Sequence, residues 1–126
     1  MQDNIQLTHA EHTRSNKKFP LSLIADDIND PLNVGGLFRL CDALGVEKLY
    51  LCGNTPSPAN AKINKTSRST EKYVEFEHHT DAEALVTALK ESGVFIVSLE
   101  ITSSSVAISS AEFVKTIQEK KPICLI

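Results

Sequence analysis

The stretch LSLIADDINDPLNVGGLFRLCDALGVEKLYLCG, residues 21–53, decides the fold. Its first apolar run, 21–24, is followed by two aspartates and an Asp-Pro turn, which is typical of a strand that ends in a loop. A second apolar run at 49–52 is closed by Gly53. The segment between the two predicted strands has helical periodicity. The stretch therefore predicts the strand–helix–strand unit from which parallel sheets are built.

The helix of this unit is predicted over residues 34–44, where apolar side chains recur every three or four positions. The side chains on this face are Val34, Leu37, Phe38, Cys41 and Leu44. Asn33 is of a residue type that caps helix N-termini, and Gly45 is of the type that ends helices in the left-handed conformation. We therefore expect the helix to be capped at Asn33 and to stop at Gly45.

Strands and helices continue to alternate along the rest of the chain. Further strands are predicted at 73–77, at 94–99 (expected to be buried) and at 122–126, and further helices at 80–92 and 109–120. The two helices open with capping boxes, in which Thr80 and Ser109 are the expected cap residues. Residues 53–70, rich in Pro, Asn, Ser, Thr and Lys, predict a long surface segment with room for a helical turn. The predicted fold class is therefore α/β, with a mainly parallel sheet and helices on both faces.

Composition bounds the class of protein. With 126 residues, 41% of them hydrophobic and 23% charged, the chain is expected to form one globular domain with its own core. No apolar run reaches the roughly 18–20 residues that span a bilayer, and the polar N-terminus has no signal-peptide core. We therefore expect a cytoplasmic protein without a membrane segment. The net charge of −3 gives no bulk attraction to nucleic acid, so any RNA contact requires a local patch.

Cysteine and histidine usage predicts no metal site. Cys41, Cys52 and Cys124 lie in apolar stretches without CxxC spacing, which favours buried reduced thiols over disulfides or zinc ligands. His9 and His12 lie in the polar N-terminal segment. The other two histidines are adjacent, so their rings would point to opposite faces of a strand and could not hold one metal ion together.

The segment with the clearest chemistry begins at the predicted helix start. Asn33 stands where unpaired backbone N–H groups and the helix dipole favour an anion such as phosphate. Gly35 and Gly36 lack side chains, so backbone or a ligand can approach closely. Arg39 follows one turn later, and its guanidinium can lean back toward the helix start. Together they predict a phosphate or ribose-phosphate pocket. Spacing leaves open an alternative, a capped helix packed closely on a strand with a solvated arginine.

A second group of polar residues lies in the long surface segment. Lys62, Lys65 and Arg68 cluster there among Asn, Thr and Ser residues that include Ser67. Cations and hydroxyls of this kind contact RNA phosphates, which makes the segment a candidate RNA-binding surface. The alternative is a set of solvated loop charges.

Residues 21–53 resemble the first motif of the SpoU (TrmH) family of RNA methyltransferases. That motif combines an apolar strand, Asp-Pro, Asn-x-Gly, an arginine, and a helix ending in Ala-x-Gly-Val before a second strand. The run Lys65-Thr-Ser-Arg-Ser69 resembles the family's Lys-Thr-Ser stretch, and 97–102 is similar to its fourth strand and following loop. The resemblance implies an α/β-knot type domain. We accordingly expect residues 1–20 to be a polar leader and 21–126 the N-terminal portion of a SpoU-type methyltransferase domain.

The resemblance also implies an activity, the transfer of a methyl group from S-adenosylmethionine to a ribose 2′-hydroxyl of tRNA or rRNA by a homodimer. On this basis Asn33 places the ribose, and Arg39 contacts the phosphate or helps to activate the hydroxyl. The cofactor-binding residues that it implies are Leu99, Glu100 and Thr102. The predicted RNA-binding residues are Gly35, Lys62, Lys65, Ser67 and Arg68. Because arginine is a poor proton acceptor, positioning is favoured over general-base work for Arg39.

Two further family motifs, a Gly-x-Glu loop and a Ser-x-Asn segment threaded through a knot, would follow the last predicted strand and are not in this sequence. We therefore expect this chain alone to bind the cofactor weakly and to be incomplete for catalysis. One alternative is a non-catalytic RNA-binding or interaction module that keeps half of the fold. Another is a response-regulator receiver domain, because Asp26 and Asp27 end the first predicted strand. A receiver also needs an aspartate after the third strand, where this chain has Glu77-His78-His79.

Overall fold

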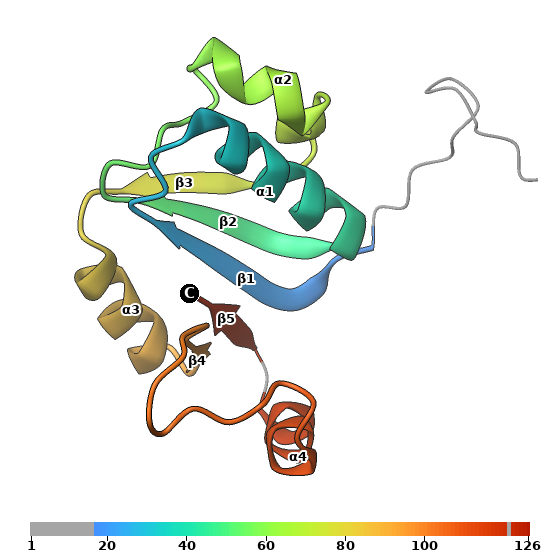
Figure 1. Ribbon diagram of the computed structural model, residues 1–126, viewed down its shortest axis with the longest axis vertical. Helices are drawn as coiled ribbons and strands as arrows, with labels where there is room; N and C mark the ends of the chain where they lie inside the picture. Colours follow the sequence, from blue (N-terminus) through green and yellow to red (C-terminus); the bar gives the residue numbers. More distant parts are fainter. Residues whose placement is uncertain (1–16, 121) are drawn as a thin grey trace, which may run out of the picture.

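Five strands form one sheet in the order β3-β2-β1-β5-β4 (Figure 1). The computed structural model describes residues 17–120 and 122–126. The strands are β1 (Phe19–Asp26), β2 (Val46–Cys52), β3 (Phe76–His79), β4 (Phe95–Val97) and β5 (Ile123–Leu125). Each neighbouring pair is parallel, so the predicted α/β class is confirmed. Receiver domains have the order 2-1-3-4-5, which excludes that alternative.

Helices pack on both faces of this sheet. They are α1 (Pro31–Leu44), α2 (Asn64–Ser67), α3 (Ala82–Glu91) and α4 (Ala111–Glu119), with the 3₁₀ turns η1 (Ala61–Ile63) and η2 (Thr70–Lys72) beside α2. Successive residues of β1 point to opposite faces. Ala25 joins the core beneath α1, whereas Ile24 joins the core beneath α3. Figure 1 shows α1 and α3 on opposite sides of the sheet. No helix within the described residues is long and apolar enough to cross a membrane.

The start of α1 differs from the prediction. The helix begins at Pro31, and Asp30 is its cap, with the side-chain oxygen accepting a hydrogen bond from the backbone N–H of Leu32 at 2.9 Å. Proline suits the first helical position because its fixed φ is already helical and it has no N–H to leave unpaired. Asn33 is therefore the third helical residue and not the cap. Gly45 ends the helix with φ 68, as predicted.

The caps of α3 and α4 also lie one residue later than predicted. Asp81 accepts from the backbone N–H of Ala84, and Ser110 accepts from that of Phe113. Thr80 and Ser109 precede these residues and are not caps. Both capping boxes contain neighbouring residues that can accept the same kind of hydrogen bond, so the sequence alone did not separate them.

The strands near the sheet edges were predicted less well than the central ones. β3 begins at Phe76, because the preceding residues belong to η2 and the turn after it. β4 covers only Phe95–Val97 and is half-buried, whereas a buried strand was predicted over 94–99. As an edge strand that pairs only with β5, β4 lacks a neighbour on one side. β5, by contrast, lies between β1 and β4, and Ile123 and Cys124 are buried.

All three cysteines are buried free thiols, as predicted. Burial raises the pKa of Cys41 and of Cys52 from 9.0 to about 11, and it also raises the pKa of Cys124. A thiolate would have to shed its hydration inside an apolar core, so the neutral form is favoured in the folded chain.

We expect the free energy of unfolding to fall as the pH rises from 9.0 toward 11. The thiol pKa values are higher in the folded chain than in the unfolded chain. Their contribution is therefore fully present below the unfolded value and is lost as the pH passes through the folded value. Urea unfolding at a series of pH values measures this loss. Cys41→Ala should show a shallower dependence than the unsubstituted chain, and equal slopes would contradict the assignment.

Candidate functional site

The candidate site lies at the carboxyl ends of β1 and β5. The chain leaves β1 toward β2 and β3 on one side, and β5 and β4 lie on the other side. Ligands of open parallel sheets bind outside the strand ends at such a reversal of strand order. The loop from β1 to α1, the loop after β4 and the end of β5 meet the sheet at this edge (Figure 1).

The loop from β1 to α1 is fixed by Thr55, a residue of the loop after β2. Its hydroxyl donates to the backbone oxygen of Ala25 and accepts from the backbone N–H of Ile28, both at 3.0 Å. Thr55 is only 2% exposed. Nearby, Asp27 has φ 51, and its carboxylate accepts from the backbone N–H of Asn54 at 2.9 Å. These contacts connect the loops after β1 and β2 and fix the approach of the chain to α1.

Thr55→Val is expected to reduce the free energy of unfolding by about 2–4 kcal/mol, since it leaves two backbone groups without their hydrogen-bond partner in a dry site. Thr55→Ser keeps the hydroxyl and removes only a methyl group, so it should cost about 1 kcal/mol. Urea unfolding of both variants gives the comparison. Equal losses for Val and Ser would show that the hydroxyl has no bracing role.

Asn33 and Arg39 both lie on the exposed side of α1. Because the Asp30 carboxylate caps the helix, a negative group already occupies part of the anion site predicted at the helix start. Arg39 forms no side-chain hydrogen bond or ion pair within the part of the chain that the structure describes. Its guanidinium is therefore available to a ligand, and its position in the helix puts it one turn beyond Gly35 on the same side.

The two glycines of α1 have different surroundings. Gly35 is buried beneath the η1–α2 segment: a Cβ there would collide with the hydroxyl of Thr66 and the backbone oxygen of Ile63, and would lie 2.9 Å from the backbone nitrogen of Ser67. A Cβ on Gly36 would meet nothing within 4 Å. The space over Gly35 is thus filled by protein, which corrects the predicted open ligand surface at this residue. Only Gly36 leaves bare backbone accessible.

The predicted basic surface lies on the η1–α2 segment. Lys62, Lys65 and Arg68 are exposed there. Ser67, predicted to contact RNA, is fully buried, and its hydroxyl donates to the Glu71 carboxylate. The buried location of Ser67 supports a structural role for its side chain and corrects the expectation of direct contact.

Contacts with the core hold this segment in place. The Thr66 hydroxyl donates to the backbone oxygen of Leu32 at 2.7 Å, which ties α2 to the first turn of α1. Ile63 is fully buried in the core beneath α1. Sequence reasoning missed Thr55 and Glu71 altogether, and neither lies in a motif that could have indicated its partner.

Leu99, Glu100 and Thr102 lie in the loop after β4, and all three are exposed. The backbone N–H of Leu99 donates to the oxygen of Ile126 at 2.8 Å, so the loop starts beside the end of β5. The Ser105 hydroxyl accepts from the backbone N–H of Thr102 at 2.7 Å and donates to the backbone oxygen of Glu100 at 3.0 Å. These bonds shape the first turn of the loop.

A hollow of about 490 Å³ adjoins this loop. Leu99 and Glu100 line it, and Thr102 reaches it through its contact with Ser105, which is also a lining residue. Sequence reasoning missed further lining residues, among them Val106 and Phe113. They come from a stretch without regular periodicity and from the start of α4, so no local pattern indicated them.

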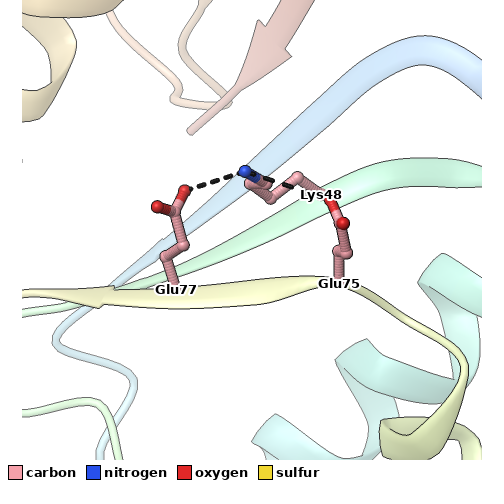
Figure 2. Close-up of polar contacts among 3 residues, drawn as sticks. All are labelled: Lys48, Glu75 and Glu77. Carbon is pink, nitrogen blue, oxygen red and sulfur yellow. Dashed lines mark ion pairs between the residues drawn. The ribbon is translucent and has the colours of Figure 1, made fainter.

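A separate polar cluster lies on β2 and β3. Lys48 Nζ is 3.0 Å from Glu77 Oε2 and 4.0 Å from Glu75 Oε2 (Figure 2). The hydrogen bond from Glu77 raises the pKa of Lys48. Lys48 lies two residues from Tyr50, which packs in the core beneath α3, so this cluster faces away from α1 and is not part of the candidate site.

Within residues 17–120 and 122–126, no group of three or more His, Cys, Asp or Glu side chains is arranged to hold a metal ion. His9 and His12 lie outside the described residues. His79, at the end of β3, contacts the Tyr50 ring with 5.7 Å between the ring centres.

Comparison with known sequences identifies the family. Residues 20–126 match the model of the SpoU rRNA Methylase family. The 23S rRNA (guanosine-2′-O-)-methyltransferase RlmB of Neisseria meningitidis is 30% identical over 86 residues, which are 68% of this chain and 34% of that protein. RlmB of Blochmanniella floridana is 29% identical over 100 residues, 79% of this chain and 39% of that protein. The chain thus spans less than two fifths of these relatives.

Solved structures agree on the fold. The TrmH/SpoU tRNA modifying enzyme of A. aeolicus superimposes with a TM-score of 0.69 at 24% identity, covering 87% of this chain and 52% of that chain. The SpoU methyltransferase AviRb of Streptomyces viridochromogenes, in complex with AdoMet, gives 0.65 at 18% identity, covering 86% of this chain and 42% of that chain. The sequence match over 20–126 and the shared fold lead to one conclusion: the chain belongs to the SpoU rRNA Methylase family.

Proposed function

We propose that this chain is part of an RNA methyltransferase that methylates a ribose 2′-hydroxyl of tRNA or rRNA. The observation that supports this most directly is the family match over residues 20–126, which includes the loop and helix with Asn33 and Arg39. The relatives named 23S rRNA (guanosine-2′-O-)-methyltransferase are consistent with it. S-adenosylmethionine, when bound, supplies the methyl group.

In this proposal Asn33 and Arg39 position the RNA. The Asn33 amide can both donate to and accept from ribose hydroxyls. Arg39 is exposed and unpaired within the described residues, and its planar fork matches two phosphate oxygens. Because a guanidinium stays protonated in proteins, Arg39 holds the phosphate beside the reacting hydroxyl and does not remove the proton itself.

The hollow beside the β4 loop fits the adenosine part of the cofactor. Its volume of about 490 Å³ lies within the usual range for small-ligand sites. Leu99 offers an apolar side chain to an adenine ring, and the Glu100 carboxylate is of the type that accepts hydrogen bonds from ribose hydroxyls. Thr102 would hold the turn through Ser105.

The exposed cations of the η1–α2 segment would contact RNA phosphates. Lys62, Lys65 and Arg68 form a local positive surface on a chain whose net charge is −3. Gly35 and Ser67 would support this surface from beneath, since both are buried. We also propose that the active protein is a cytoplasmic homodimer and that residues before β1 form a leader.

Methyl transfer from tritium-labelled S-adenosylmethionine to unmodified tRNA and rRNA tests the activity. Ribose methylation blocks alkaline cleavage at the modified nucleotide, which locates the product. The assay should use this chain and any longer form of the protein that contains it. If no form transfers label to RNA, the proposed activity is wrong.

A non-catalytic RNA-binding module is the second candidate, because the chain spans less than two fifths of its curated relatives. Calorimetric titration of the chain with S-adenosylmethionine, together with an RNA-binding assay, separates the two. RNA binding without cofactor binding or methyl transfer in any form of the protein would favour the module.

A further inference from the structure

Two consecutive residues of the basic segment have a backbone conformation that side chains disfavour. Arg68 has φ 54 and Ser69 has φ 66, and neither is a glycine. In the left-handed region Cβ crowds the neighbouring carbonyl oxygen, so such residues persist only where surrounding contacts hold them. Since Arg68 is also one of the exposed cations, the contacts that hold this turn also determine where its charge lies.

Side chains on both sides of the turn supply those contacts. The Ser67 hydroxyl donates to Glu71 Oε2 at 2.5 Å, across the turn. The Thr70 hydroxyl donates to the backbone oxygen of Ser67, also at 2.5 Å. Ser67 is fully buried and Thr70 is 7% exposed, so little water competes for these bonds.

The same turn is attached to α1. Thr66, which precedes Ser67, donates to the backbone oxygen of Leu32 at 2.7 Å, and the backbone at Ser67 packs over Gly35. A change in the turn would therefore alter where Lys65 and Arg68 lie relative to α1 and Arg39.

We propose that Glu71 is a positioning residue for RNA binding, which acts by holding the Arg68–Ser69 turn through Ser67; this rests on the proposed function of the basic segment. Glu71 is an acid among cations, so by charge alone it repels phosphate. Its half-buried carboxylate instead accepts from a neutral hydroxyl inside the turn. The two roles predict opposite effects when the carboxylate is removed.

Glu71→Ala should weaken binding of fluorescently labelled rRNA fragments about tenfold and lower the salt-dependence slope by about one, as expected when one phosphate contact is lost. Glu71→Gln keeps an oxygen that can accept from Ser67 and removes the charge, so it should bind as tightly as the unsubstituted chain or more tightly. Glu75→Ala removes the same charge from a side chain that is 76% exposed outside the turn, and it should not weaken binding.

Relief of the strained backbone provides a rescue. Glycine adopts positive φ without penalty, so adding Ser69→Gly to Glu71→Ala should restore affinity to within about twofold of the unsubstituted chain. Tryptic cleavage after Arg68 gives a second readout that requires no RNA. It should be at least about tenfold faster in Glu71→Ala than in Glu71→Gln, and Ser69→Gly should slow it again.

The proposal is overturned if Glu71→Ala binds RNA as tightly as the unsubstituted chain, or if Ser69→Gly restores neither affinity nor resistance to trypsin. If the unsubstituted chain binds no RNA, the proposed function of the segment has failed. The trypsin comparison still decides whether Glu71 holds the turn.

Discussion

Arg39→Ala is expected to lower methyl transfer by about 10²- to 10³-fold in whichever form of the protein is active, this chain or a longer one that contains it. Arg39 is exposed and makes no side-chain hydrogen bond or ion pair with other described residues, so the fold does not depend on it. The free energy of unfolding should change by less than about 0.5 kcal/mol. Labelled methyl transfer and urea unfolding, measured on the same preparation, give both values.

Arg39→Lys is the matched control. It keeps the positive charge and loses the planar fork, so it should retain part of the affinity for RNA while transferring methyl groups more slowly than the unsubstituted enzyme. Full activity in Arg39→Ala would remove Arg39 from the site. Loss of activity together with a loss of stability would instead assign it a structural role.

Gly35→Ala is expected to destabilise the fold by about 3 kcal/mol, and Gly36→Ala to stabilise it by up to about 1 kcal/mol. The two positions are adjacent in α1 and the substitution is the same. At Gly35 the added methyl group would collide with Ile63 and Thr66, and much of that contact is with backbone, which cannot rotate away. At Gly36 it would enter open space, so only the helix propensity of alanine remains.

Urea unfolding of the two variants measures the difference in sign. Hydrogen exchange adds the location: in Gly35→Ala, amides of the η1–α2 segment should exchange faster, because the segment must move away from α1. Similar stability changes for both variants would contradict the close packing over Gly35.

The strand–helix pattern could be predicted because its signals are local. The apolar runs that became β1, β2 and β5, and the glycine that ends α1, follow from neighbouring residues. Helix caps were placed less well. Asp30, Asp81 and Ser110 each have a neighbour with a similar side chain, and the choice between them depends on where the helix meets the sheet.

The contacts that assemble the candidate site could not be predicted in the same way. Thr55 reaches Ala25 and Thr66 reaches Leu32, which are 30 and 34 residues away in the chain. No periodicity records such pairs, so the segment after β2 was predicted as a surface loop although it contributes Ile63 to the core. The glycines at 35 and 36 show the same limit, since sequence indicated a close approach but not that α2 makes it.

The strand order determines when the sheet can be completed during folding. β5 pairs with β1 through Leu21–Ile123, Ser22–Cys124 and Leu23–Leu125, partners that are about a hundred residues apart in the chain. β1, β2, β3 and α1 can associate through nearer contacts, whereas one side of β1 lacks its partner until β5 is synthesised. Contacts of such long range fold slowly, and an unpaired strand edge favours association with other chains. A nascent chain of this protein should therefore be most prone to aggregation just before β5 leaves the ribosome.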